Sequence, residues 1–370
     1  MPLNTIPNKG LTSRGYPSDR LVTPIIINGD MSVAQRGTSE TGLRNTGGVY
    51  LIDRWAYRRS GTFTTDTFDM SQSTDVPSGQ GFVKSLKMDN LSTQSSPPNP
   101  TYSAIAQNIE GQNLQMLKKG TSNAESITIS FWVKSNKTGT YILEVRDSDN
   151  GRTINKSYSI NSASTWEKKT ISYDGDTSGV LDNDNATSFE VTWFLSASAN
   201  FTSGTLQTSW GTLTNENRAV GQVNLLDDAN NEWYITGVQL EVGEFDSTTL
   251  PSFPFESFAS NLQRCQRYYQ KSYNIGTTAG TATSDGIMLG IRGNGAFAGA
   301  TRLPVVMRTA PTLTIYSNTT GASGKVRNAD TGSDETASTN GVSDNSFNAQ
   351  GTTSSISTVY QFQYVAEAEL

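Results

Sequence analysis

The sequence predicts an all-β protein, and three observations lead to this prediction. The chain is rich in Gly, Ser, Thr and Asn, while 34% of its residues are hydrophobic and 9% are aromatic. Segments that alternate apolar and polar residues recur at intervals of about 10–15 residues, as the strands of a β-sandwich do. A convincing helical pattern occurs once, near residues 256–273. Many short strands joined by turns account for this composition.

Charge and residue usage exclude several classes of function. The 370 residues carry a net charge of -6 and contain no histidine and one cysteine. An acidic chain does not suit a nucleic-acid partner, and no apolar run reaches the length of about 18 residues that membrane insertion needs. Without histidine there is no Ser-His triad, and one cysteine forms neither an internal disulfide nor a cysteine-based zinc site. We therefore expect a protein that is not an enzyme.

Residues 1–24 are expected to form an extended arm. They contain four prolines, show no periodicity and have no signal-peptide pattern. The arm is either a loose terminus or a segment that lies on a neighbouring subunit or another protein.

The first domain is predicted over residues 25–250. Ile25–Ile27 are expected to form a short strand that ends at Asn28-Gly29, and Tyr50, Ile52, Trp55 and Tyr57 to point inward. Gly237 interrupts the alternation of the last strand and suggests a bulge. Further strands are predicted at 62–70, 82–89, 101–109, 126–135, 140–147, 152–160, 165–174, 188–198 and 233–242.

A Pro/Phe-rich turn and a connecting helix are predicted over residues 251–273. The helix carries an apolar stripe that either covers its own domain or packs around an axis between three copies. In the second interpretation Leu262, Cys265 and Tyr269 form an oligomer interface. Cys265 is expected to be a buried apolar group, because no histidine is present to activate its thiol.

Residues 274–370 are predicted to form a smaller C-terminal β-domain. Residues 317–355 are so polar that they form either a disordered loop or a long exposed tip. A final strand follows, with Tyr360, Phe362 and Tyr364 on one face. The few apolar anchors of the polar segment are Val326, Val342, Phe347 and Ile356.

Five motifs in order resemble one modular domain: INGDMSVAQRG (27–37), YLIDRW (50–55), ITISFWVKSNKTGTY (127–141), WEKKTISYDGD (166–176) and WYITGVQLEVG (233–243). It is the carbohydrate-binding-module-like jelly roll of bacteriophage tail fibres and related virion proteins. CQRYYQKSY (265–273) is similar to the helix that follows this jelly roll in many marine phages, including cyanophages. The C-terminal residues resemble the small β-sandwich domain that accompanies it.

The resemblance implies a jelly-roll β-sandwich, a short helix and a second, smaller C-terminal β-sandwich domain. It also implies a virion protein, most simply a tail fibre subunit that helps to recognise host surface polysaccharide. A homotrimer that joins other virion proteins through the N-terminal arm is then expected. Two alternatives stay open: a structural or decorating protein of tail or capsid without a receptor role, and a polysaccharide depolymerase tailspike.

Acidic loops are the candidates for a metal site. DSDNG (147–151) resembles the opening of a calcium loop, with Asp147 and Asp149 as possible Ca²⁺ ligands, but it is also a good hairpin turn. Residues 174–185 have the same ambiguity, and Asp30 and Asp53 are further candidates. Jelly-roll binding modules often carry a structural Ca²⁺, so the resemblance favours one without choosing its ligands.

Tryptophans are the candidates for glycan contact. Trp132 is out of phase with Phe131 and Val133 and should point away from the core, whereas Trp193 should lie in the core. Trp210 has no apolar sequence around it. If an indole contacts glycan, Trp210 or Trp132 is expected to do so. No acidic residue is expected to have a pKa raised by an apolar run, as acid catalysis would need.

Overall fold

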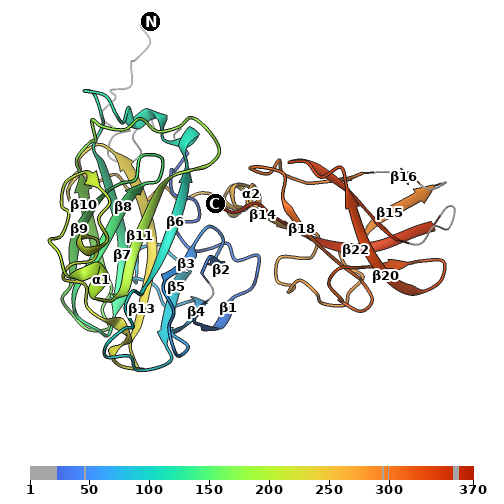
Figure 1. Cartoon of the computed structure of the whole chain (residues 1–370), viewed down its shortest axis with the longest axis horizontal. Coiled ribbons are helices and arrows are strands. Elements are labelled where there is room, and N and C mark those ends of the chain that lie inside the picture. Colours follow the sequence, from blue (N-terminus) through green and yellow to red (C-terminus); the bar gives the residue numbers. More distant parts are fainter. Residues whose placement is uncertain (1–22, 46, 294–295, 299, 353–357) are drawn as a thin grey trace, which may run out of the picture.

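The computed structural model describes residues 23–45, 47–293, 296–298, 300–352 and 358–370. Two β-domains lie side by side, with a short helix between them (Figure 1). The predicted N-terminal arm lies outside the described residues, apart from its last two positions. The all-β fold class is confirmed.

The larger domain is a sandwich of two antiparallel sheets, which we call sheet A and sheet B. Sheet A consists, in spatial order, of β1 (Ser39–Leu43), β4 (Phe68–Ser73), β5 (Ser85–Asn90), β13 (Glu232–Val242), β7 (Ile127–Ser135) and β10 (Glu167–Tyr173). Sheet B consists of β12 (Gly211–Thr212), β9 (Arg152–Ile160), β8 (Gly139–Asp147), β11 (Thr187–Ala197), β6 (Tyr102–Glu110), β3 (Ala56–Ser60) and β2 (Val49–Tyr50).

The core lies between these sheets. The Trp193 ring centre is 5.6 Å from those of Trp55 and Phe131, and all three side chains are fully buried. Large aromatic side chains bury much apolar area each, which compensates for the polar composition of the chain. The residues of β7 predicted to face inward are all buried: Ile127, Ile129, Phe131 and Val133.

The strand predicted at residues 25–27 is wrong. Ile26 and Ile27 are buried, but the chain bends here instead of joining a sheet. The Gln107 side chain replaces a neighbouring strand: its Oε1 accepts from Ile27 N and its Nε2 donates to Ile27 O, both at 2.9 Å. Asn28 then turns the chain with a φ of 58°.

Helix α2 (Phe258–Gln266) is shorter than predicted. Ser257 caps its first turn by accepting a hydrogen bond from Ser260 N. Beyond it, β14 (Tyr269–Lys271) pairs with the C-terminal strand, so the helical prediction was wrong there. No helix in the described part of the chain is long and apolar enough to cross a membrane. The remaining helices are short: α1 (Ala199–Thr202), η3 (Gly111–Asn113), η4 (Gln115–Leu117), η5 (Asn215–Asn217) and η6 (Leu225–Asp227).

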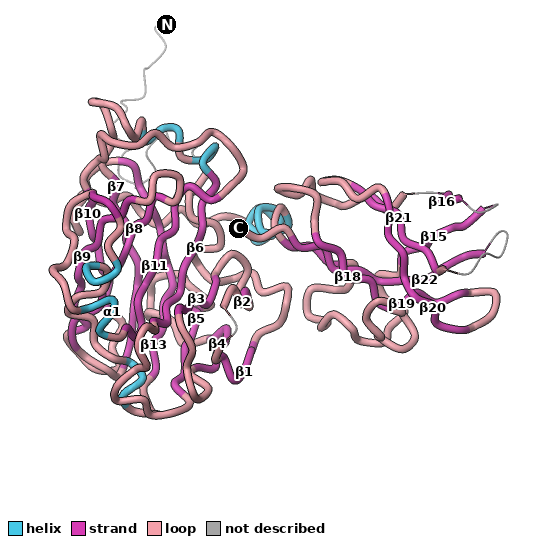
Figure 2. Tube along the Cα trace, viewed as in Figure 1, coloured by secondary structure: helices cyan, strands magenta, loops and turns pink. Residues whose placement is uncertain are grey.

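The smaller domain is built around β22 (Thr358–Glu367), the predicted final strand, which belongs to one antiparallel sheet (Figure 2). The described part of residues 317–355 contributes β19, β20 and β21 to it, so the interpretation as a disordered loop was wrong there. Val326 and Phe347 are buried anchors, Val342 is exposed, and Ile356 lies outside the described residues. The other strands are β15 (Met288–Gly293), β16 (Ala296–Ala298), β17 (Thr301–Arg302), β18 (Thr312–Tyr316), β19 (Lys325–Asn328), β20 (Ser333–Asn340) and β21 (Ser346–Gly351).

Candidate functional site

The outer face of sheet A carries aromatic side chains on neighbouring strands. Trp132 of β7 is half-buried and points away from the core, as its phase predicts. In the register between β7 and β13, Thr236 lies opposite Trp132 and Tyr234 lies opposite Lys134. These four side chains therefore share one surface.

Trp166, which directly precedes β10, lies on the same surface. Its ring centre is 6.1 Å from that of Tyr234 at an interplanar angle of 66°, and its Nε1 donates to Asp75 Oδ1 at 2.9 Å. Trp166 is half-buried, so part of the indole faces solvent. We call Trp132, Trp166 and Tyr234 the aromatic face. The sequence held a signal for Trp166, because it is out of phase with the buried Tyr173 within the strand predicted at residues 165–174.

Charged groups surround the aromatic face. The Lys134 Nζ lies 4.1 Å from the Tyr234 ring centre and 5.7 Å from that of Trp166, and it forms an ion pair with Asp75. Burial would raise the pKa of Asp75, but hydrogen bonds from Lys134 and Trp166 outweigh it and hold this pKa below its ordinary value. Asp75 is therefore a carboxylate at neutral pH and holds Lys134 and Trp166 in place.

A second charged group lies on the other side of Tyr234. Lys87 Nζ is 2.6 Å from Asp89 Oδ2 and 3.2 Å from Glu232 Oε2, and the Tyr234 hydroxyl donates to Glu232 Oε2 at 2.8 Å. Burial lowers the pKa of Lys87, but these hydrogen bonds raise it by more, so the net shift is upward. The aromatic face thus has fixed charges of both signs on both sides.

Three phenylalanines gather at the bulge in β13. The register shifts between Thr236 and Gln239, and Gly237 has a φ of 63°, which agrees with the predicted bulge. A Cβ on Gly237 would lie 2.5 Å from Phe82 Cζ, so a side chain here would displace this ring, and the positive φ also favours glycine. Phe253 and Phe255 pack on Phe82, and Phe255 is 54% exposed. The bulge thus carries a cluster of apolar rings that is partly open to solvent.

Trp210 lies in a polar stretch of the sequence, but in the fold it contacts an aromatic residue of the core. Its ring stacks on Phe189 of the core with centres 5.9 Å apart and planes at 30°. Its Nε1 donates to Asp174 O at 2.7 Å. Trp210 is half-buried at the edge of sheet B, whereas Trp132 and Trp166 belong to sheet A. The two predicted glycan-contacting tryptophans do not lie together.

The predicted calcium ligands have different surroundings. Asp147 is fully buried, and its Oδ2 lies 2.5 Å from Lys119 Nζ. Asp149 accepts from Asp182 N at 3.0 Å. The DSDNG segment is a hairpin turn between β8 and β9, which is the alternative stated for it. No group of three or more His, Cys, Asp or Glu side chains suited to a metal occurs within the described ranges.

The further candidates Asp30 and Asp53 make structural hydrogen bonds. Asp30 Oδ1 accepts from Asn261 Nδ2 at 3.1 Å and from Ser32 Oγ at 2.9 Å. Asp53 is buried and accepts from Gln35 N and Nε2. Burial raises the pKa of Asp53 despite these partners. We expected no acidic residue to have a pKa raised by an apolar run. Asp53, in the run YLIDRW, shows that this prediction was wrong.

Two other buried carboxylates are held by arginines in bidentate pairs. Glu144 accepts from Arg218 at 2.7 and 2.6 Å, and Glu110 accepts from Arg267 at 2.8 Å through each oxygen. A carboxylate fixed in this way at both oxygens is poorly placed to exchange a proton with a substrate. These pairs are structural.

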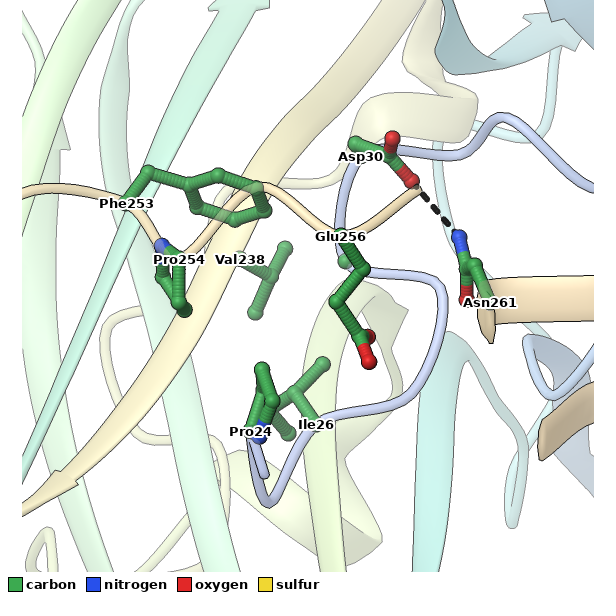
Figure 3. A pocket seen from close by; sticks show the side chains of 9 residues that line it. Pro24, Ile26, Asp30, Val238, Phe253, Pro254, Glu256 and Asn261 are labelled. Carbon is green, nitrogen blue, oxygen red and sulfur yellow. Dashed lines mark hydrogen bonds between the residues drawn. The ribbon is translucent and has the colours of Figure 1, made fainter. Parts of the chain in front are cut away.

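A small pocket lies beside the start of α2 (Figure 3). Pro24, Ile26, Phe253 and Glu256 line it, and Asn261 closes it by its hydrogen bond to Asp30. Its accessible space is about that of one water molecule. The pocket therefore lies where the beginning of the sandwich meets α2, and it has no room for a sugar.

The oligomer interface predicted on the helix stripe is corrected for two of its residues. Cys265 is fully buried and Tyr269 is 4% exposed within a single chain, where Cys265 packs with Ile27 and Val33. Leu262 is half-buried against the same cluster. The stripe thus covers its own domain, which was the other interpretation.

Comparison with known proteins finds similar structures but no similar sequence family. No family model matches the chain, and no curated protein does. The enzymatically active domain of tailspike protein 4 of bacteriophage CBA120 is similar at 14% identity and a TM-score of 0.33, over 59% of this chain and 21% of that one. The chain thus spans about a fifth of the tailspike domain.

Two sugar-related structures are similar over most of their own length. A putative sugar binding protein from Bacteroides thetaiotaomicron matches at 10% identity and a TM-score of 0.32, over 60% of this chain and all of that one. A family 61 carbohydrate-binding module in complex with β-1,4-galactotriose matches at 12% identity and a TM-score of 0.29, over 60% of this chain and 99% of that one. Similarities at this level carry no argument about function.

Proposed function

We propose that this protein is a tail fibre subunit of a virion and that it binds host surface glycan through the aromatic face. The observation that carries the glycan assignment is the presence of two half-buried indoles, Trp132 and Trp166, on one outer sheet face. The order of the five motifs supports the virion assignment. The homotrimer and the attachment to other virion proteins rest on that resemblance.

The chemistry of the aromatic face suits a sugar. An indole offers a flat apolar surface against which the C–H face of a pyranose packs. Asp75 and Glu232 offer acceptors and Lys134 and Lys87 offer donors around these rings. Sugar hydroxyls both donate and accept, so they can share hydrogen bonds with ion-paired groups. Because the charged groups hold one another in place, little side-chain freedom is lost on binding.

The proposed activity is binding without hydrolysis. Glu144 and Glu110 are fixed by arginines, and Asp53 is enclosed by Gln35 and Arg36. To test this, purified protein is incubated with host surface polysaccharide and the chain length is followed. Unchanged length is expected, whereas progressive shortening would favour a depolymerase.

The glycan assignment is tested by measuring binding of the full chain to polysaccharide from host cells by calorimetry. We expect saturable binding that is lost in a Trp132→Ala, Trp166→Ala double variant with an unchanged melting temperature (Tm). Binding that persists in the folded double variant would place the glycan site elsewhere. Absence of binding by the native protein would favour the structural or decorating role.

A further inference from the structure

Lys119 occupies the centre of a cage of oxygen atoms between the two acidic loops. Its side chain is 3% exposed, and its Nζ lies 2.5 Å from Asp147 Oδ2 and 3.0 Å from Asp176 Oδ2. It also donates to the main-chain oxygens of Ser178 at 2.9 Å and Gly179 at 2.8 Å. Four oxygens from two separate loops therefore converge on one ammonium.

The walls of the cage are themselves fixed. Asn150 donates to Asp147 from its main-chain N at 3.0 Å and from its Nδ2 at 2.9 Å. Arg152 donates to both oxygens of Asp176, at 2.7 and 3.0 Å. The Trp210 ring centre lies 5.3 Å from Lys119 Nζ and covers the cage. Two cations thus face two carboxylates, with Lys119 3% exposed and Arg152 21% exposed.

We propose that the Lys119 ammonium is a built-in cation, and that the oxygen cage binds a divalent metal ion, Ca²⁺ in particular, once this ammonium is removed. Ca²⁺ takes carboxylate and carbonyl oxygens in flexible geometry, and waters complete its shell. The cage supplies two carboxylates and two carbonyls. In the native chain these oxygens already surround the Lys119 ammonium, which is part of the chain itself. The two loops are therefore held together without a metal ion.

Each of the two acidic loops contributes one carboxylate to the cage. Asp147 comes from the DSDNG turn and Asp176 from residues 174–185, whereas Lys119 lies far from both in the chain, after η4. Asp149 is outside the cage, where it accepts from the Asp182 main chain. The proposal is independent of glycan binding.

The test compares the native chain with Lys119→Ala and, as a matched control, Lys118→Ala. Lys118 is the adjacent lysine, has a side chain 53% exposed and pairs with Glu125. The Tm is measured in EDTA, in CaCl₂ and in MgCl₂, and Ca²⁺ binding by calorimetry. We expect no Ca²⁺ response from the native or the Lys118→Ala protein. We expect Lys119→Ala to melt lower in EDTA and to regain at least about 2 °C with CaCl₂.

Two results would overturn the proposal. One is a folded Lys119→Ala protein whose Tm and calorimetric signal do not respond to Ca²⁺. The other is a native protein that binds Ca²⁺ and loses stability in EDTA. If Lys119→Ala does not fold in EDTA, it is refolded with and without CaCl₂. Recovery of the folded state only with CaCl₂ supports the cage, and failure in both contradicts it.

Discussion

The guanidinium carbon of Arg54 lies 3.5 Å from the centre of the Tyr268 ring. Arg54 belongs to the turn between β2 and β3, while Tyr268 lies between α2 and β14. The same guanidinium forms an ion pair with Glu369 and donates to Asn108 O at 2.7 Å. One arginine, 1% exposed, thus ties the sandwich to the segment that enters the smaller domain and to the residues that leave it.

The first prediction concerns this junction. Arg54→Met keeps the apolar stem but removes the charge, which leaves Glu369 with Arg36 as its other ion-pair partner. Because Glu369 keeps Arg36, the free energy of unfolding is expected to fall by less than the roughly 3–5 kcal/mol that an uncompensated buried charge costs, and by more than about 1 kcal/mol. Urea unfolding measures it, with the exposed Arg302→Met as control. A loss below about 0.5 kcal/mol would show that the contact does not hold the domains together.

The second prediction concerns the aromatic face. Trp132→Ala and Trp166→Ala are each expected to weaken glycan binding about 10-fold, because each removes a stacking surface. Trp210→Ala serves as the matched control at the edge of sheet B and should leave affinity unchanged. Affinity is measured by calorimetry and the Tm of each variant is checked. A larger effect from Trp210→Ala than from the other two would move the site to sheet B.

The third prediction is a pH dependence at Glu110. Burial raises the pKa of Glu110, but hydrogen bonds from Arg267 and Tyr268 outweigh it, so its folded-state pKa is below the ordinary value. The unfolded chain therefore binds the proton more readily. The stabilisation is fully present above the unfolded pKa of about 4.3 and is lost as the pH falls through the folded value.

Glu110→Gln tests this dependence. The variant should be less stable than the native protein at pH 7, and the difference in Tm should shrink as the pH is lowered below about 4. The exposed Glu216→Gln serves as control and should show little difference at either pH. A difference between Glu110→Gln and the native protein that stays constant from pH 7 to pH 3 would contradict the assignment.

The fourth prediction concerns Cys265. Burial raises the pKa of this thiol well above its ordinary value, so a thiol reagent at pH 8 should leave it unmodified until the chain is unfolded. Cys265→Lys should lower the Tm of the chain itself, since it places a charge in a closed apolar cluster. Gln263→Lys, on the exposed side of the same helix, is the control. Rapid labelling of the folded protein would show that the cluster opens.

The fifth prediction concerns assembly and the arm, which is outside the described residues. Light scattering at micromolar concentration is expected to give a trimer. Deleting residues 2–22 is expected to leave folding intact and to abolish incorporation into particles, because the arm supplies scattered apolar anchors without a core of its own. A monomer would remove the trimer from the proposal, and normal incorporation of the truncated protein would place the attachment elsewhere.

Local pattern in the sequence was enough for most strands and for the direction of individual side chains. Successive side chains of a strand point to opposite faces, so the phase of Trp132 against Phe131 predicted its outward position. The same reasoning failed for Tyr269, whose spacing from Cys265 suited a helix. Pairing of β14 with β22 supplies main-chain hydrogen bonds that the short helical pattern could not match.

The tertiary structure alone decided which of these faces became neighbours. Trp166 reaches Tyr234 because the sheet order places β10, β7 and β13 side by side, and periodicity does not contain the order of strands. Lys119 lies between Asp147 and Asp176 for the same reason. The alternation of apolar and polar residues predicts which side chains of a single strand are buried. The partners of charged and aromatic side chains depend instead on contacts between residues far apart in the chain. The sequence thus determined the sandwich and its inward faces, and the packing of its strands and loops determined the aromatic face and the oxygen cage around Lys119.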